Sequence, residues 1–260
     1  MTEATIHPSA WVDDAAVIGE GVSIGAFCVI HAGVELRPGT TVGSHCILGE
    51  TGRPGGAATQ PTVIGEGSLL RSGTIVYAGV ATGEKFETGH RATIRENTQI
   101  GHHVRIGTLS DIQGDCSFGD YCRLHSNVHV GKGTRVADFV WLYPYVVITN
   151  DPHPPSDVVQ GVTVERFAVI ATSSVILPGV TIGSGSLVSA MSLVRSHVRA
   201  GMVVAGNPAE EVCEVTRIRD RRDRRQSAYP WRYHFERGMP WEGIGYDAWA
   251  AEHDKNAGQG

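Results

Sequence analysis

Aliphatic residues recur every six positions along most of this chain. The series run from Ile6 to Leu48, from Ile64 to Ile148 and from Val164 to Ala200, with two threonines and one phenylalanine as departures in the middle series. Glycine often follows at the second position, and the fifth is small or branched. An amphipathic helix would repeat about every 3.6 residues and a half-buried strand every two. The pattern is therefore an internal repeat, which is typical of a solenoid.

Three sides of six residues make a triangular coil. Because strand side chains alternate, positions one and five point inward, positions six and two point outward, and the turn falls at positions three and four. Successive coils stack at about 4.8 Å, the usual spacing of paired strands, so each residue lies beneath the one 18 positions later. No single coil can bury its apolar side alone, so the repeats predict one continuous, all-β domain.

Two segments interrupt the repeat and are predicted to be loops, at residues 49–63 and 149–163. The repeat closes at Gly206-Asn207-Pro208-Ala209. The polar segment from Glu210 to Arg225 is predicted to be helical, and the aromatic tail that begins at Tyr229 is expected to dock on a neighbouring surface. We thus expect a β-helix domain over residues 1–208 and a C-terminal helix with an aromatic tail over residues 209–260.

Composition excludes several classes of protein. A net charge of −5 argues against a general nucleic-acid binder. No apolar run approaches the length of a membrane span, and the first residues lack a secretory signal pattern. Four of the five cysteines occupy the small fifth position, so we expect buried thiols rather than disulfides or metal ligands, in a reducing cytoplasm. The four are Cys28, Cys46, Cys116 and Cys122.

Stacking by 18 residues brings polar side chains together near the middle of the chain. His129 is expected directly above Asp111, where a carboxylate can orient an imidazole. His125 is expected on the preceding face beneath Tyr143, and Asn127 at the corner between the two faces. Surface histidines on a β-helix are the plain alternative.

A second predicted column carries cations and an indole on the same face as His125. Arg105 and Arg123 stack beneath Trp141, an arrangement that can hold a diphosphate and stack a base. A solvated surface ladder is an equally weighted alternative. The second loop is expected to lie over this cleft through Asn150, Asp151 and His153.

The repeats of Ile-Gly-x-x-Val/Ser/Cys-x with the closing Gly206-Asn207-Pro208-Ala209 resemble the hexapeptide-repeat acyltransferases over residues 6–209. The resemblance implies a left-handed parallel β-helix, a homotrimer with active sites between subunits, and an acyl-CoA donor. Four segments narrow the resemblance to nucleotide-sugar N-acyltransferases, which acylate an amino group on dTDP- or UDP-linked amino-deoxy sugars. These segments are 108–115, 124–129, 139–141 and 149–154. The tail at 237–246 is similar to that of dTDP-3-amino-3,6-dideoxyhexose N-acetyltransferases.

Amide formation from a thioester needs an unprotonated amine, a positioned carbonyl and a donor for the developing oxyanion. We expect His125 to serve as the base and Asn127 to position the amine or the carbonyl. The pair of His129 and Asp111 is the second choice. Family members in which the departing CoA thiolate takes the proton leave the choice of base open.

Small outward side chains after the second loop suggest where acyl-CoA would lie. Ala171, Ser189 and Asn207 are expected to stack in one line that admits an extended pantetheine arm. Arg195 and Arg199 are placed to meet CoA phosphates. Between residues 217 and 225 six arginines alternate with two aspartates, which favours a solvated helix with ion pairs over a phosphate site.

The leading hypothesis is a CoA-dependent N-acyltransferase, with acetyl as the default group, that acts on a dTDP-linked amino-deoxy sugar and needs no metal. An O-acyltransferase acting on a hydroxyl is the first alternative. A zinc lyase of the γ-carbonic-anhydrase type is the second, although His125 and His129 do not match the ligand spacing of that family. The acyl chain length, the position of the amino group and the nucleotide are left open.

Overall fold

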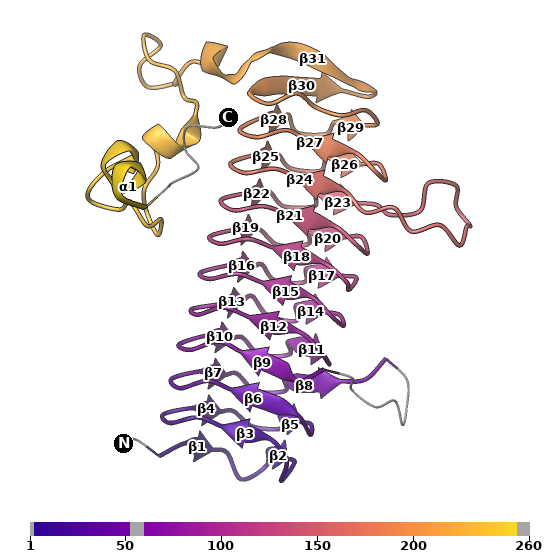
Figure 1. The fold of residues 1–260 in the computed structure, drawn as a ribbon, viewed down its shortest axis with the longest axis vertical. Coiled ribbons are helices and arrows are strands. Elements are labelled where there is room, and N and C mark those ends of the chain that lie inside the picture. Colours follow the sequence, from indigo (N-terminus) through magenta and orange to yellow (C-terminus); the bar gives the residue numbers. More distant parts are fainter. Residues whose placement is uncertain (1–2, 53–59, 254–260) are drawn as a thin grey trace.

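The repeat folds into a three-sided parallel β-solenoid, shown in Figure 1. The computed structural model describes residues 3–52 and 60–253. Each coil adds one short strand to each of three sheets, so strands three apart in the chain are hydrogen-bonded neighbours. The predicted all-β fold, a left-handed parallel β-helix with a short C-terminal extension, is confirmed. Residues 53–59, which belong to the first predicted loop, lie outside the described residues.

The first sheet runs the full height of the prism. Over the described part of the chain it has 12 strands. Residues 18 apart are paired as predicted, for example Arg105 with Arg123 and Arg123 with Trp141. The strands are β1 (Thr5–Ile6), β4 (Ser23–Ile24), β7 (Thr41–Val42), β10 (Leu69–Leu70), β13 (Glu87–Thr88), β16 (Arg105–Ile106), β19 (Arg123–Leu124), β22 (Trp141–Leu142), β25 (Val169–Ile170), β28 (Leu187–Val188), β30 (Met202–Gly206) and β31 (Ala209–Glu214).

The second sheet follows the first around each coil. In the described ranges it has 10 strands, all paired in parallel. The second predicted loop leaves the prism after its strand β23, because β23 ends at Ile148 and the next strand begins at Thr163. The strands are β2 (Trp11–Val12), β5 (Val29–Ile30), β8 (Ile47–Glu50), β11 (Ile75–Tyr77), β14 (Thr93–Ile94), β17 (Asp111–Ile112), β20 (His129–Val130), β23 (Val147–Ile148), β26 (Val175–Ile176) and β29 (Leu193–Val194).

The third sheet closes the triangle. It has nine strands among the residues described. Near its end the repeat shortens, since Ile182 is bridged to Val198, a separation of 16 residues (198 − 182). The strands are β3 (Val17–Ile18), β6 (Val34–Leu36), β9 (Thr62–Ile64), β12 (Ala81–Thr82), β15 (Gln99–Ile100), β18 (Ser117–Phe118), β21 (Arg135–Val136), β24 (Thr163–Val164) and β27 (Thr181–Ile182).

The core is a stack of inward aliphatic side chains that runs the length of the prism. Ile106, Leu124 and Leu142 lie above one another and are buried. The four cysteines at fifth positions are buried and free, as predicted. Many corners are turned by a fourth-position residue in the left-handed conformation, such as Asn127 with φ of 59°. The shortened last coil corrects one member of the predicted series, because Val198 is buried while Ala200 is exposed.

The helix predicted from Glu210 to Arg225 is wrong. Ala209–Glu214 forms β31, which pairs antiparallel with β30 and covers the open edge of the first sheet. A 3₁₀ turn at Val215–Arg217 follows. The arginine-rich segment is a hairpin closed by a bridge between Arg219 and Ser227. Its two aspartates, Asp220 and Asp223, accept backbone N–H groups at the tip. The expected ion pairing is present at Asp220, which pairs with Arg222 at 3.2 Å, but within a hairpin rather than a helix.

The aromatic tail docks on the corner between the third and first sheets. It contains a 3₁₀ turn at Trp231–Tyr233 and the helix α1 (Tyr246–His253). Trp241 is 1% exposed and packs against the rings of Phe139 and Phe167, which are stacked on each other at that corner. No helix in the described residues is long and apolar enough to cross a bilayer.

Candidate active site

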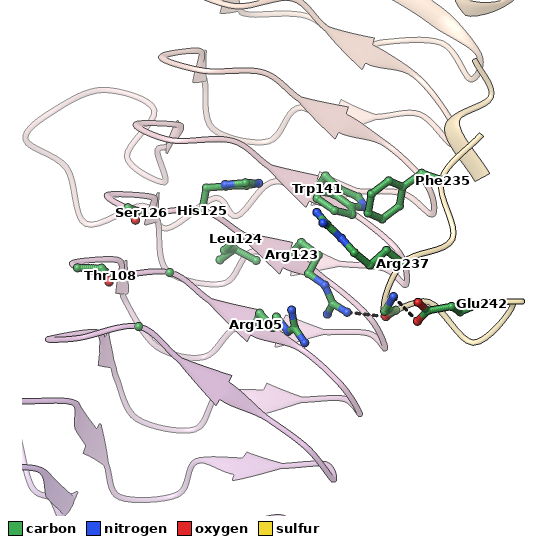
Figure 2. Close-up of a pocket in the computed structure, with 13 residues that line it drawn as sticks. Arg105, Thr108, Arg123, Leu124, His125, Ser126, Trp141, Phe235, Arg237 and Glu242 are labelled. Carbon is green, nitrogen blue, oxygen red and sulfur yellow. Dashed lines mark hydrogen bonds between the residues drawn. The ribbon is translucent and has the colours of Figure 1, made fainter. Parts of the chain in front are cut away.

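A cavity of about 620 Å³ lies on the first sheet, between strands β13 to β22 and the docked tail (Figure 2). The first sheet of the prism forms one wall of the cavity and the C-terminal tail forms the other. Residues about a hundred positions apart in the sequence therefore line the same cavity. Four of the predicted site residues line it: Arg105, Arg123, His125 and Trp141. The remaining lining residues are Gly89, Gly107, Thr108, Leu124, Ser126, Phe235, Arg237, Gly238 and Glu242.

His125 follows β19 at the outward second position of its repeat. Its imidazole stacks on the Tyr143 ring, with centroids 4.7 Å apart, and lies 6.0 Å from the Trp141 ring. Partial burial disfavours the charged imidazolium and lowers the pKa of His125 below its ordinary value. The imidazole is therefore neutral at neutral pH, which is the form that accepts a proton.

Gly107 leaves the space that His125 occupies. A Cβ added at Gly107 would lie 2.4 Å from the carbonyl carbon of His125 in the coil above. We expect Gly107→Ala to shift the His125 backbone and lower turnover by about a hundredfold, since a displacement near 1 Å can cost that much. Steady-state kinetics with circular dichroism measure the effect. Gly52→Ala is the control because a Cβ there meets no atom within 4 Å, and full activity of Gly107→Ala would contradict the prediction.

The column of Arg105, Arg123 and Trp141 exists, but its middle member is not a free cation. Arg123 is 7% exposed, and its guanidinium donates to the carbonyls of His103, Cys122 and Gly238, the last at 2.8 Å. Burial, followed by the charge of Arg105, lowers the pKa of Arg123 to about 10. Arg123 therefore anchors the tail to the prism.

Arg105 and Trp141, unlike Arg123, are not used to hold the described part of the tail by hydrogen bonds to its backbone. The Arg105 guanidinium lies 3.2 Å from a Glu87 carboxylate oxygen and is half exposed. Trp141 meets the Trp231 and Phe235 rings edge to face, at 5.7 and 5.3 Å. Its indole Nε1 is buried and has no hydrogen-bond partner among the described residues. Arg105 thus lies one coil below Arg123, and Trp141 lies one coil above it.

Asp111 and His129 form the predicted pair on the second sheet. Their strands are in register, and His129 Nδ1 lies 3.2 Å from Asp111 Oδ2. The hydrogen bond to His129 is the main cause that lowers the pKa of Asp111. Neither residue lines the cavity, and nor does Asn127, which turns the corner between the two sheets. Within one chain, the structure therefore separates His125 from the other three predicted catalytic residues.

The second loop does not cover the cavity of its own chain. It leaves from the corner between the second and third sheets, on the opposite side of the prism from the tail (Figure 1). Asp151 organises this loop, since its carboxylate accepts the backbone N–H groups of His153 and Ser156, both at 3.0 Å. The Ser156 hydroxyl donates to the same carboxylate and lowers the pKa of Asp151. The expectation that Asn150, Asp151 and His153 lie over this cleft is therefore wrong within one subunit.

Asn207 does not continue the line of small outward residues that was predicted to admit the pantetheine arm. Leu187 and Val188 pair with Val203 and Val204, so the next residue, Ser189, lies beside Ala205 rather than Asn207. The cause is the shortened last coil, which shifts the register by two residues. Asn207 instead lies in the turn between β30 and β31. Ala171 and Ser189 keep their predicted alignment.

The two arginines near this line differ in their surroundings. Arg199 forms an ion pair with Glu211 of β31, with Nε 2.7 Å from the carboxylate. Arg195 follows β29 on the second sheet and is exposed. No three His, Cys, Asp or Glu side chains lie together as a candidate metal site in residues 3–52 and 60–253.

Sequence reasoning missed the wall of the cavity that the tail supplies. Phe235, Arg237, Gly238 and Glu242 come from a segment whose docking position no repeat encodes. A signal for docking was present, since Tyr121, Phe139 and Phe167 occupy fourth positions of their repeats and form a column of stacked rings. Three outward aromatic rings at one corner favour an apolar partner.

No protein-family model matches the chain. The chain is similar to the curated bifunctional protein GlmU of Alkaliphilus oremlandii, at 27% identity over 186 residues, which cover 64% of this chain and 38% of the relative. GlmU of Clostridioides difficile is 26% identical over 207 residues, which cover 75% of this chain and 43% of the relative. The chain thus spans less than half the length of these curated relatives.

Among solved structures, the UDP-N-acetylglucosamine acyltransferase of Francisella novicida matches with a TM-score of 0.45 and 17% identity, over 80% of this chain and 69% of that chain. The Arabidopsis UDP-N-acetylglucosamine acyltransferase matches with a TM-score of 0.34 and 24% identity, over 80% of this chain and 74% of that one.

Proposed function

We propose that the protein is a CoA-dependent N-acyltransferase that moves an acyl group, by default acetyl, to the amino group of a dTDP-linked amino-deoxy sugar. The observation that carries the proposal is the cavity on the first sheet, which unites a desolvated His125 with arginines and aromatic rings. A base, cations and stacking surfaces in one space suit a nucleotide-linked amine. The resemblance of segment 237–246 to the dTDP-3-amino-sugar enzymes supports this branch.

In this mechanism His125 handles the proton of the substrate amine. The amine nitrogen attacks the thioester carbonyl carbon, forming the C–N bond while neutral His125 accepts the N–H proton. The C–S bond then breaks, CoA leaves as the thiolate, and the proton passes from the imidazolium to that sulfur. The products are the amide and free CoA. Asn127 does not line this cavity in its own chain, so its proposed role in positioning the amine or carbonyl requires a site shared with a neighbouring copy.

The proposal includes a cytoplasmic homotrimer with its active sites between subunits. The loop carrying Asn150, Asp151 and His153 points away from the cavity of its own chain, so the proposal places it at the cavity of a neighbouring copy. The His129 and Asp111 face would likewise complete a neighbour's site. Acyl-CoA is proposed to run past Ala171 and Ser189, with its phosphates near Arg195.

Incubation of the pure protein with acetyl-CoA and a dTDP-3-amino-3,6-dideoxyhexose is expected to release free thiol in proportion to N-acetylated sugar. Thiol is measured with a chromogenic disulfide and the product by mass spectrometry. A panel of UDP- and dTDP-linked 3- and 4-amino sugars determines the nucleotide and the amine position. Turnover only with hydroxyl acceptors would replace the proposal with an O-acyltransferase, and no turnover across the panel would refute it.

A further inference from the structure

The tail places Arg237 at the cavity, and this arginine has no carboxylate partner among the described residues. Figure 2 shows Arg237 extending from the tail into the space bounded by Trp141, Arg105 and His125. The Arg237 guanidinium lies 5.8 Å from the Phe235 ring centre, and among the described residues it makes no ion pair. The nearby Glu242 carboxylate is already an acceptor for the Gly238 N–H, at 2.8 Å.

The segment that presents Arg237 is fixed on both sides. Arg123 donates to the carbonyl of Gly238, the next residue, and Gly238 adopts φ of 70°, which suits glycine. Met239 and Trp241, which follow, are buried in the aromatic cluster of the tail. The backbone that carries Arg237 is thus fixed beside the cavity, while its exposed side chain remains available to a ligand.

The balance of charge around the cavity favours an anion. The arginines that line it are Arg105, Arg123 and Arg237, whereas Glu242 is the one acidic residue among its described lining residues. Arg123 already donates to three carbonyl groups. Arg105, which pairs with Glu87 but is half exposed, faces the cavity from the prism, and Arg237 faces it from the tail. The planar forks of the two arginines suit bidentate contacts with phosphate oxygens, and a diphosphate offers two such groups.

We propose that Arg237, together with Arg105, binds the diphosphate of the nucleotide-sugar substrate, with the nucleobase against Trp141 and Phe235. This subsite rests on the proposed function, because it places the sugar between the diphosphate and His125. CoA also carries a diphosphate. The aromatic rings beside Arg237, and the general base His125 in the same cavity, favour the nucleotide sugar over CoA as the ligand. A volume of about 620 Å³ lies within the usual range for one small-molecule ligand.

The test compares Arg237→Ala and Arg237→Lys with wild type by isothermal titration calorimetry against dTDP, thymidine and CoA. Arg237→Ala should raise the Kd for dTDP by about tenfold or more, because a charge-assisted bidentate contact is lost. Thymidine, which has no phosphate, and CoA should bind as they do to wild type. Arg237→Lys should recover part of the affinity. Arg37→Ala is the matched control, since Arg37 is exposed on the third sheet and pairs with Glu35.

The outcomes separate the subsite from the proposed function. Unchanged dTDP affinity in Arg237→Ala, in a protein whose wild type acetylates the amino sugar, overturns the subsite and leaves the function standing. Weakened CoA binding with unchanged dTDP binding also overturns it, because the cation then serves the donor. Arg237-dependent dTDP binding in a protein that acetylates no amino sugar supports the subsite and refutes the proposed function.

Discussion

His125→Asn is expected to lower kcat by about 10² to 10⁴ with little change in the KM for acetyl-CoA, because removal of a general base costs that much. The reason lies in the surroundings of His125: its ring is stacked on Tyr143 and its pKa is lowered by burial. Initial rates of thiol release at saturating acetyl-CoA measure the effect. His7→Asn is the control, since His7 is exposed on the first coil.

The pH profile tests the same residue in the wild type. A base acts in its neutral form, so kcat/KM should fall as pH drops through the His125 pKa. A separate rise at higher pH belongs to deprotonation of the substrate amine and should remain in His125→Asn. Because burial lowers that pKa, the fall should begin below the ordinary histidine range near pH 6.5. The acidic limb should disappear in His125→Asn. A variant that keeps wild-type kcat would show instead that the departing thiolate takes the proton.

Trp241→Ala is expected to release the C-terminal tail from the prism, with a local loss of about 3–5 kcal/mol, the usual cost of truncating a buried tryptophan. Trp241 is 1% exposed, contacts the rings of Phe139, Phe167 and Tyr246, and donates from Nε1 to the Phe235 carbonyl at 3.0 Å. Hydrogen exchange should rise sharply over residues 229–253 and little in the coils. The KM for the nucleotide sugar should rise with it, because one wall of the cavity is lost.

Trp11→Ala is the matched control for this variant. Trp11 is 52% exposed on the second strand and lies far along the prism from the tail. Its replacement should leave exchange in the tail and the substrate KM unchanged. If Trp241→Ala unfolds the coils together with the tail, or leaves tail exchange at the wild-type level, the docked tail is not the separate unit described above.

The stacking of residues 18 positions apart predicted much of the candidate site from the sequence alone. This stacking rule placed Asp111 beneath His129 and His125 beneath Tyr143. The structure shows His129 Nδ1 3.2 Å from the Asp111 carboxylate and the rings of His125 and Tyr143 stacked. The rule works because each coil is hydrogen-bonded in register to the next, so a position along the chain fixes a height and a face. It fails where the coil length changes, which is why Asn207 does not continue the line of Ala171 and Ser189.

The sequence by itself determined the solenoid, its core and the outward columns, since these depend on a local period that every coil repeats. Only the tertiary structure decided that Arg123 holds the tail rather than a ligand, and that Arg237 faces His125 across one cavity. The contact between Arg123 and Gly238 joins residues 115 apart. Such a contact depends on where the aromatic tail finds apolar surface, and no periodic pattern encodes that position.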